Sequence, residues 1–202
     1  MLKLKSVLLI IFTFAVIGCS EPKLPPLAYG SKIVAFGDSL TYGVGSGNGP
    51  TYPQALAELT GFEVVNEGIS GETTTGGLQR FAQVLDKHQP DMVILMEGGN
   101  DILRNHNPKT TKQNLATMIE IAQAREIRII FMGVPEKKLF SDSAPFYQEL
   151  AEQYALVYDG DSLSELLRSR QYKSDPIHLN GAGYQALANR IYQLMQTSGA
   201  ID

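Results

Sequence analysis

Short apolar runs alternate with longer amphipathic stretches along most of this 202-residue chain. Most of the short runs are continuously apolar, which is typical of parallel strands covered by helices on both faces. They indicate strands at residues 32–36, 63–66, 92–96, 127–132 and 156–158. We therefore predict an α/β fold, a three-layer α/β/α sandwich with a five-stranded parallel sheet.

The longer stretches carry apolar residues at the spacing of one helix face. Two of them are well defined: Leu115, Met118, Ile119 and Ala122, and then Tyr184, Leu187, Ala188, Ile191 and Met195. Such stripes are core positions and need no cofactor to explain them. No internal repeat or second boundary interrupts the pattern, so we predict a single domain over residues 32–202.

The N-terminus has the pattern of an export signal. Lys3 and Lys5 precede an uncharged apolar run over residues 7–17, and Gly18 and Cys19 follow it. The run is shorter than the roughly 20 residues that a transmembrane helix needs. We therefore predict that residues 1–18 are a signal peptide that is removed from the mature protein.

Cys19 is the predicted attachment point of a lipid. The segment Val16-Ile17-Gly18-Cys19 resembles the bacterial lipobox, whose cysteine is acylated and becomes the first mature residue; an ordinary cleavage site beside a lone thiol is the alternative. As the only cysteine, Cys19 has no intramolecular disulfide partner. Residues 19–31 contain three prolines and one glycine, which favours a semi-extended tether.

Charge and composition limit the partners. The net charge is −4, and because the leader carries two lysines and no acids, the mature form is near −6. With no basic cluster, nucleic acid is excluded as a partner, and membrane attachment is expected through the lipid on Cys19. We expect a monomer on the periplasmic or cell-envelope face of a membrane, and Ser20 favours the outer membrane of a didermic host.

Ser39 is the candidate nucleophile. It lies in Gly37-Asp38-Ser39-Leu40-Thr41, directly after the first predicted strand, where a ligand site of an α/β sheet is expected. A serine at such a turn either presents its hydroxyl to a ligand or caps the helix that follows, and this segment alone leaves both roles open. The Gly-x-Ser-x-Gly elbow is absent.

Gly71 and Asn100 follow the second and third predicted strands. A glycine lets the backbone approach a ligand closely, and an asparagine offers N–H donors to a developing oxyanion. A plain turn glycine and a loop-capping asparagine remain the alternatives. Each residue is a weak indication by itself.

Asp175-Pro176-Ile177-His178 is the most informative segment. A serine nucleophile needs a base, and a histidine base needs a carboxylate on its second nitrogen. Asp175 and His178 can share one helical turn, in which Asp175 also suits the N-cap and Pro176 the first position. Of the other histidines, His88 is expected to be solvated and His106 has no acid nearby in sequence.

Taken together, the four segments resemble the SGNH-hydrolase (GDSL-esterase) family. They occur in the family's order, each at a predicted strand end or terminal turn, and the likeness spans nearly the whole mature chain. Within the family the segments look most like arylesterases and the acyl-thioesterase/lysophospholipase type. Tyr42 and Glu97 depart from what is usual there, which leaves the acyl-chain preference open.

The resemblance implies a flavodoxin-like fold and a set of site residues. Ser39 would be the nucleophile, His178 the base and Asp175 its orienting acid. The Ser39 and Gly71 backbone N–H groups and the Asn100 side chain would form the oxyanion hole. No metal or other cofactor is implied.

The predicted reaction is hydrolysis of a small-molecule acyl ester or thioester through a covalent acyl-enzyme. Side chains expected to form an apolar groove are those of Ile102, Leu103, Leu139, Phe140, Ile177 and Leu179, although core packing explains each equally well. A carbohydrate O-deacetylase is the first alternative. A non-catalytic ligand-binding lipoprotein is the second, and the complete Ser-Asp-His set argues against it.

Overall fold

The computed structural model describes residues 23–136 and 142–202, and it contains the predicted sheet. The five strands are parallel and lie in the order β2-β1-β3-β4-β5. Their bounds are β1 Lys32–Gly37, β2 Glu63–Gly68, β3 Met92–Met96, β4 Arg128–Met132 and β5 Val157–Asp159. The predicted α/β class and strand number are confirmed, and strand ends differ from the prediction by only one or two residues.

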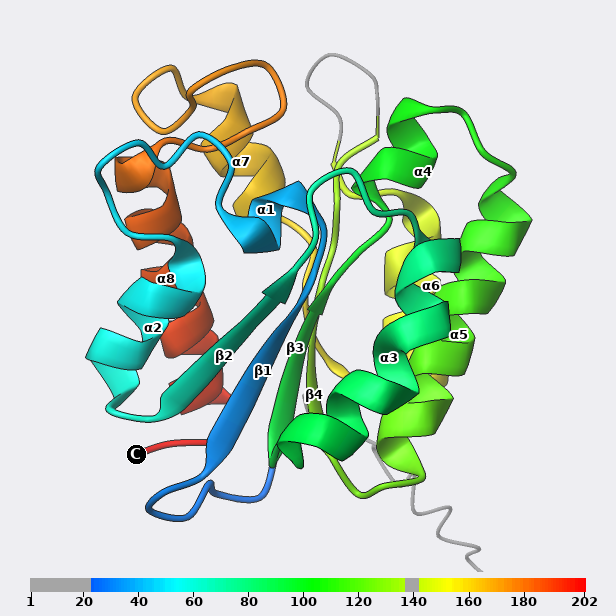
Figure 1. Ribbon diagram of the computed structural model, residues 1–202, viewed down its shortest axis with the longest axis vertical. Helices are drawn as coiled ribbons and strands as arrows, with labels where there is room; N and C mark the ends of the chain where they lie inside the picture. Colours follow the sequence, from blue (N-terminus) through cyan, green and yellow to red (C-terminus); the bar gives the residue numbers. More distant parts are fainter. Residues whose placement is uncertain (1–22, 137–141) are drawn as a thin grey trace, which may run out of the picture.

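Helices cover both faces of the sheet, which completes the three layers (Figure 1). Helices α3, α5 and α6 lie on one face, and α2 and α8 lie on the other. The bounds are α1 Ser39–Tyr42, α2 Tyr52–Thr60, α3 Thr74–His88, α4 Gly99–Leu103, α5 Pro108–Gln123, α6 Pro145–Gln153, α7 Ser162–Arg168 and α8 Gly181–Thr197. Both apolar stripes singled out in the sequence are buried in the core, in α5 and α8.

The strand order places a ligand site at one edge of the sheet. The chain passes from β1 to β2 on one side and then to β3 on the other side of β1. Loops that leave the carboxyl ends of β1 and β3 therefore diverge and open a crevice between them. Ser39 follows β1 and Asn100 follows β3, so both lie at this crevice.

The described part of the expected tether, residues 23–31, is attached to the domain. Leu24 N–H donates to the Ser198 carbonyl at 2.8 Å, and Leu27 N–H donates to the Ala200 carbonyl at 2.8 Å. Both leucine side chains pack against the core. Residues 23–28 form neither helix nor strand and residues 29 and 30 form a turn, but the stretch lies on the folded unit.

The predicted signal peptide, residues 1–18, and the predicted lipid site Cys19 lie outside the described residues. Within the described ranges, none of the helices combines the length and apolar character needed to cross a membrane.

Candidate active site

Three predicted site residues form a continuous hydrogen-bonded chain. His178 Nε2 lies 3.0 Å from Ser39 Oγ, and His178 Nδ1 lies 2.8 Å from Asp175 Oδ2. The histidine side chain is 15% exposed and the aspartate side chain 44%, so the chain runs from the protein interior towards solvent. A base able to take the serine proton and an acid able to orient that base are therefore both in place.

The segment that carries Asp175 and His178 is a turn, which corrects the predicted helical arrangement. Asp175 Oδ1 accepts the backbone N–H groups of Ile177 and His178, both at 2.9 Å. The Ser174 N–H closes the turn on the His178 carbonyl at 3.0 Å. An aspartate that bonds to its own following backbone favours such a turn over a helix, and the last helix begins only at Gly181.

The same bonds control the charge of Asp175. Partial burial raises the pKa of its carboxyl, but the hydrogen bond from the His178 ring and those from the two backbone N–H groups lower it by more. The net pKa lies below the ordinary aspartate value, so the carboxylate remains charged under all but acidic conditions.

Ser39 does not cap the helix that follows β1. Asp38 is the N-cap of α1, and its Oδ1 accepts the Leu40 N–H at 3.0 Å. The Ser39 hydroxyl is thereby left to His178. Gly37 permits this close turn, because a Cβ at that position would lie 2.0 Å from the Met96 carbonyl oxygen of the neighbouring strand.

Asn100 is held beside the serine by Asp38. Its Nδ2 donates to Asp38 Oδ2 at 3.2 Å, which leaves its second N–H for another acceptor. Asn100 and Ser39 line the same cavity. Asn100 also lies in the first turn of α4, whose N-cap Gly98 has a φ of 112° that favours glycine.

Gly71 lies on the loop after β2 with a φ of 81°. Its carbonyl accepts a hydrogen bond from Arg104 Nη2 at 3.0 Å, which joins this loop to the end of α4. No described residue accepts a hydrogen bond from the backbone N–H of Ser39 or of Gly71. Arg104 was not predicted as part of the site, because nothing in its local sequence indicates this partner.

Asp38 is a buried acid whose importance sequence reasoning missed. Burial raises its pKa from 3.8 to about 6, against the opposing effects of the Leu40 N–H and of His178. The nearby acids Asp101 and Glu72 raise it further. The carboxylate that orients Asn100 is therefore costly to ionise in the folded protein.

This raised pKa predicts a pH-dependent stability. The folded state binds the Asp38 proton more tightly than the unfolded state does. The stability that protonated Asp38 contributes to the folded state is therefore fully present below about pH 4 and is lost as pH rises through about 6. The unfolding free energy of an Asp38→Asn variant, relative to the unsubstituted protein, should therefore rise by about 2–3 kcal/mol between pH 4 and 8. Urea unfolding across that range measures the difference, and a difference independent of pH would contradict the assignment.

Glu97 is the second unusual acid. It follows β3, its side chain is fully buried, and neither carboxylate oxygen is within hydrogen-bond geometry of a described donor. Burial and then the charge of Asp38 raise its pKa well above the ordinary value, while the Gly98 N–H has a weaker opposite effect. Neither Glu97 nor the exposed Tyr42 is among the described residues that line the cavity at Ser39.

The cavity at Ser39 has a volume of about 580 Å³, within the range of small-molecule sites. Of the predicted groove residues, Ile102, Leu103 and Ile177 line it. Leu179 does not, because it is fully buried in the core. Leu139 and Phe140 lie outside the described residues. Helix α7, which the sequence pattern did not predict, supplies Ser164, Leu167 and Arg168.

The other two histidines are not part of the hydrogen-bonded chain that Ser39, His178 and Asp175 form. His88 Nε2 lies 2.6 Å from Glu67 Oε1, and its side chain is only 14% exposed. The prediction of a solvated histidine at this position was wrong, because strand β2 brings Glu67 alongside the end of α3. His106 is half exposed, and its Nδ1 lies 3.7 Å from Asp101 Oδ1.

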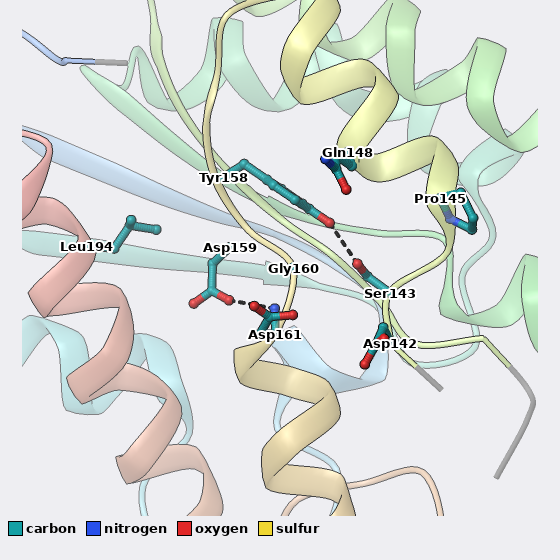
Figure 2. A pocket seen from close by; sticks show the side chains of 9 residues that line it. All are labelled: Asp142, Ser143, Pro145, Gln148, Tyr158, Asp159, Gly160, Asp161 and Leu194. Atoms are coloured by element: carbon teal, nitrogen blue, oxygen red, sulfur yellow. Dashed lines mark hydrogen bonds between the residues drawn. The ribbon is translucent and has the colours of Figure 1, made fainter. Parts of the chain in front are cut away.

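A second cavity, of about 490 Å³, is lined by residues of β5, α6 and α8 and of the loops that precede α6 and α7 (Figure 2). Residues that line it bond to one another: Ser143 Oγ lies 2.7 Å from the Tyr158 hydroxyl, and Asp159 Oδ1 accepts the Asp161 N–H at 3.0 Å. Ser39, His178 and Asp175 do not line this second cavity. It is therefore not the candidate active site.

A serine, histidine and aspartate joined by hydrogen bonds at the carboxyl edge of a parallel sheet are the arrangement expected of a serine hydrolase. The chain belongs to the GDSL-like Lipase/Acylhydrolase family, whose model matches residues 35–186. Membership places it among the ester hydrolases and confirms the resemblance found in the sequence.

Individual relatives agree with this family. The chain is 35% identical to an arylesterase of Vibrio mimicus over 131 residues, which cover 60% of this chain and 66% of that protein. It is 26% identical over 177 residues to the Escherichia coli K12 protein thioesterase 1/protease 1/lysophospholipase L1, with 84% and 85% of the two chains covered. The solved structure of AlinE4, an SGNH-hydrolase family esterase, superposes with a TM-score of 0.63 at 31% identity, covering 85% of this chain and 98% of that one.

Proposed function

We propose that this chain hydrolyses acyl esters or thioesters through a covalent acyl-enzyme on Ser39. The observation that carries the proposal is the continuous chain from Ser39 Oγ through the His178 ring to Asp175. A serine hydroxyl is a weak nucleophile until a base removes its proton, and His178 Nε2 is within reach of that proton.

In the first step Ser39 Oγ attacks the acyl carbonyl carbon while its proton passes to His178 Nε2. Asp175 accepts a hydrogen bond from the Nδ1–H of the ring and stabilises the imidazolium that forms. The tetrahedral intermediate then collapses, the bond to the leaving group breaks, and His178 gives its proton to the departing alcohol or thiol.

In the second step water attacks the acyl-serine. His178 takes a proton from the water as the new carbon–oxygen bond forms, and it returns a proton to Ser39 Oγ as the ester bond to the enzyme breaks. A carboxylic acid leaves and the serine is restored. The sequence of bond changes needs no further reactant.

The oxyanion of both intermediates would be held by Asn100 together with the Ser39 and Gly71 N–H groups. Asp38 fixes the Asn100 amide so that one of its N–H groups remains available. We expect Asn100→Ala to lower kcat about 10²–10³-fold with a smaller change in KM, because the lost donor acts on charge that develops in the transition state. Steady-state kinetics on an aryl ester measure this, and a kcat like that of the unsubstituted enzyme would remove Asn100 from the mechanism.

The lining of the cavity supports a substrate whose acyl chain is longer than acetyl. Ile102, Leu103, Leu167 and Ile177 provide apolar lining close to Ser39. The names of the relatives, arylesterase and thioesterase/lysophospholipase, agree with acyl esters and thioesters as the substrate class.

The test is hydrolysis of p-nitrophenyl esters of increasing acyl length, with the corresponding acyl thioesters in parallel. We expect kcat/KM to rise from acetate to medium-length chains, because added methylenes become buried against the cavity lining. A clear preference for acetate over all longer chains would favour the carbohydrate O-deacetylase alternative. No hydrolysis of any ester by the folded protein would favour the non-catalytic alternative.

The N-terminal pattern supports a second part of the proposal. We infer that Cys19 carries the lipid of an exported lipoprotein, and that the monomeric enzyme lies on a cell-envelope face of a membrane. Mass spectrometry of the N-terminal peptide from the membrane fraction tests the lipid. A mature N-terminus other than an acylated Cys19 would overturn it.

A further inference from the structure

The chain that leads to Cys19 is fastened at one end of the sheet. Leu24 and Leu27 donate backbone hydrogen bonds to the Ser198 and Ala200 carbonyls, which follow the end of α8. Lys23 Nζ adds a hydrogen bond to the Thr197 carbonyl at 2.6 Å. These bonds place the start of the described chain beside the C-terminal end of the last helix.

Arg128 holds the same segment from the sheet side. Its Nε donates to the Pro25 carbonyl at 2.9 Å, and its Nη2 donates to the Pro26 carbonyl at 3.1 Å. Arg128 is the first residue of β4, so the segment lies at the amino ends of the parallel strands. A guanidinium that bonds two successive carbonyls fixes both position and direction of this stretch.

The active site lies at the opposite end of the sheet. Ser39 and Asn100 follow the carboxyl ends of β1 and β3, and the six residues of β1 alone span about 20 Å. In Figure 1 the blue segment before β1 lies at the bottom of the molecule, whereas α1, α4 and α7 lie at the top.

The segment between Cys19 and the first described residue is too short to carry a lipid on Cys19 to the active-site end of the sheet. Three residues lie between Cys19 and Lys23, and the four Cα–Cα steps from one to the other reach at most about 14 Å when fully extended. A compact domain of this length is roughly 40 Å across. A lipid on Cys19 therefore holds the amino edge of the sheet near the membrane and cannot bring the cavity at Ser39 to the same surface.

We infer that the cavity at Ser39 opens away from the membrane that carries the anchor, an inference that rests on the proposed lipid at Cys19. The enzyme then takes its esters from the aqueous phase, and lipids of the anchoring leaflet are not its substrates. The fastened segment acts as a spacer of fixed direction.

Energy transfer between a dye on the protein and acceptor-labelled lipids in phosphatidylcholine vesicles tests the orientation. The lipidated chain is labelled at one of two exposed positions, through Tyr42→Cys near the cavity or Tyr29→Cys near the anchor. Transfer from position 29 should be several-fold more efficient than from position 42. Equal transfer, or stronger transfer from position 42, would overturn the inference.

A control variant carries a flexible Gly/Ser insertion of about 30 residues between Ser20 and Glu21, which spans about 30 Å on average. It should bring the two transfer efficiencies together.

Flotation of the vesicles reports the anchor separately: protein that does not float refutes the lipid and the orientation with it, whereas floating protein with the wrong transfer pattern refutes the orientation alone. Hydrolysis of a water-soluble ester should stay within about two-fold on binding to vesicles, and a large loss would also count against the inference.

Discussion

Replacing Ser39 by alanine is expected to lower kcat for an activated aryl ester by about 10⁴–10⁶-fold, because the atom that forms the acyl-enzyme is gone. The residual rate would come from binding and the oxyanion donors alone. Ser39 contributes little to the fold, since Asp38 rather than Ser39 caps α1. The unfolding free energy should therefore change by less than about 1 kcal/mol.

Ser164→Ala is the matched control for this variant. Ser164 lines the same cavity, but its hydroxyl is bonded to the Asp161 carbonyl at 2.8 Å and is not part of the Ser39 chain. Its kcat should stay within a few-fold of that of the unsubstituted enzyme. If both alanine variants retained similar activity, Ser39 would not be the nucleophile.

Asp175→Asn is expected to lower kcat by about 10⁴-fold. The asparagine carbonyl can still accept the backbone N–H groups of Ile177 and His178, so the turn should remain. Its amide nitrogen, however, replaces Asp175 Oδ2 and presents a donor to His178 Nδ1. The ring would then carry its proton on Nε2, where it cannot accept the proton of Ser39.

This second variant separates orientation from folding. Circular dichroism and urea unfolding should match the unsubstituted protein, while kcat falls with little change in KM. Because the pKa of Asp175 lies below its ordinary value, the defect should persist across neutral and moderately alkaline pH. An Asp175→Asn enzyme with more than a tenth of normal kcat would show that His178 does not depend on this carboxylate.

The sequence was sufficient to predict the sheet and the location of the site. Continuous apolar runs such as residues 92–96 identify buried strands by themselves, and polar residues that directly follow strands are brought to one edge by the parallel topology. The spacing of Asp175 and His178 was a reliable indication of a partnership. Their turn was mistaken for a helix, since the Asx-type bonding of Asp175 competes with helix capping over the same residues.

Contacts between segments that lie far apart in the chain could not be predicted from the sequence. The roles of Asp38 and Arg104 depend on partners 62 and 33 residues away, and no local pattern encodes them. Helix α7 has only seven residues, and whether they line the cavity depends on the direction that the polypeptide takes after β5. The attachment of residues 23–31 likewise depends on carbonyl groups at the C-terminus, which composition cannot reveal.

The most direct test of the central claim is mass spectrometry after reaction with an alkyl fluorophosphonate, which traps an activated serine. We expect one phosphonyl group per chain, located on Ser39, with loss of esterase activity in proportion to labelling. His178→Ala should abolish the labelling, since no base would remain to activate the hydroxyl. Full loss of esterase activity with the label on another residue, or undiminished labelling of Ser39 without His178, would contradict the account.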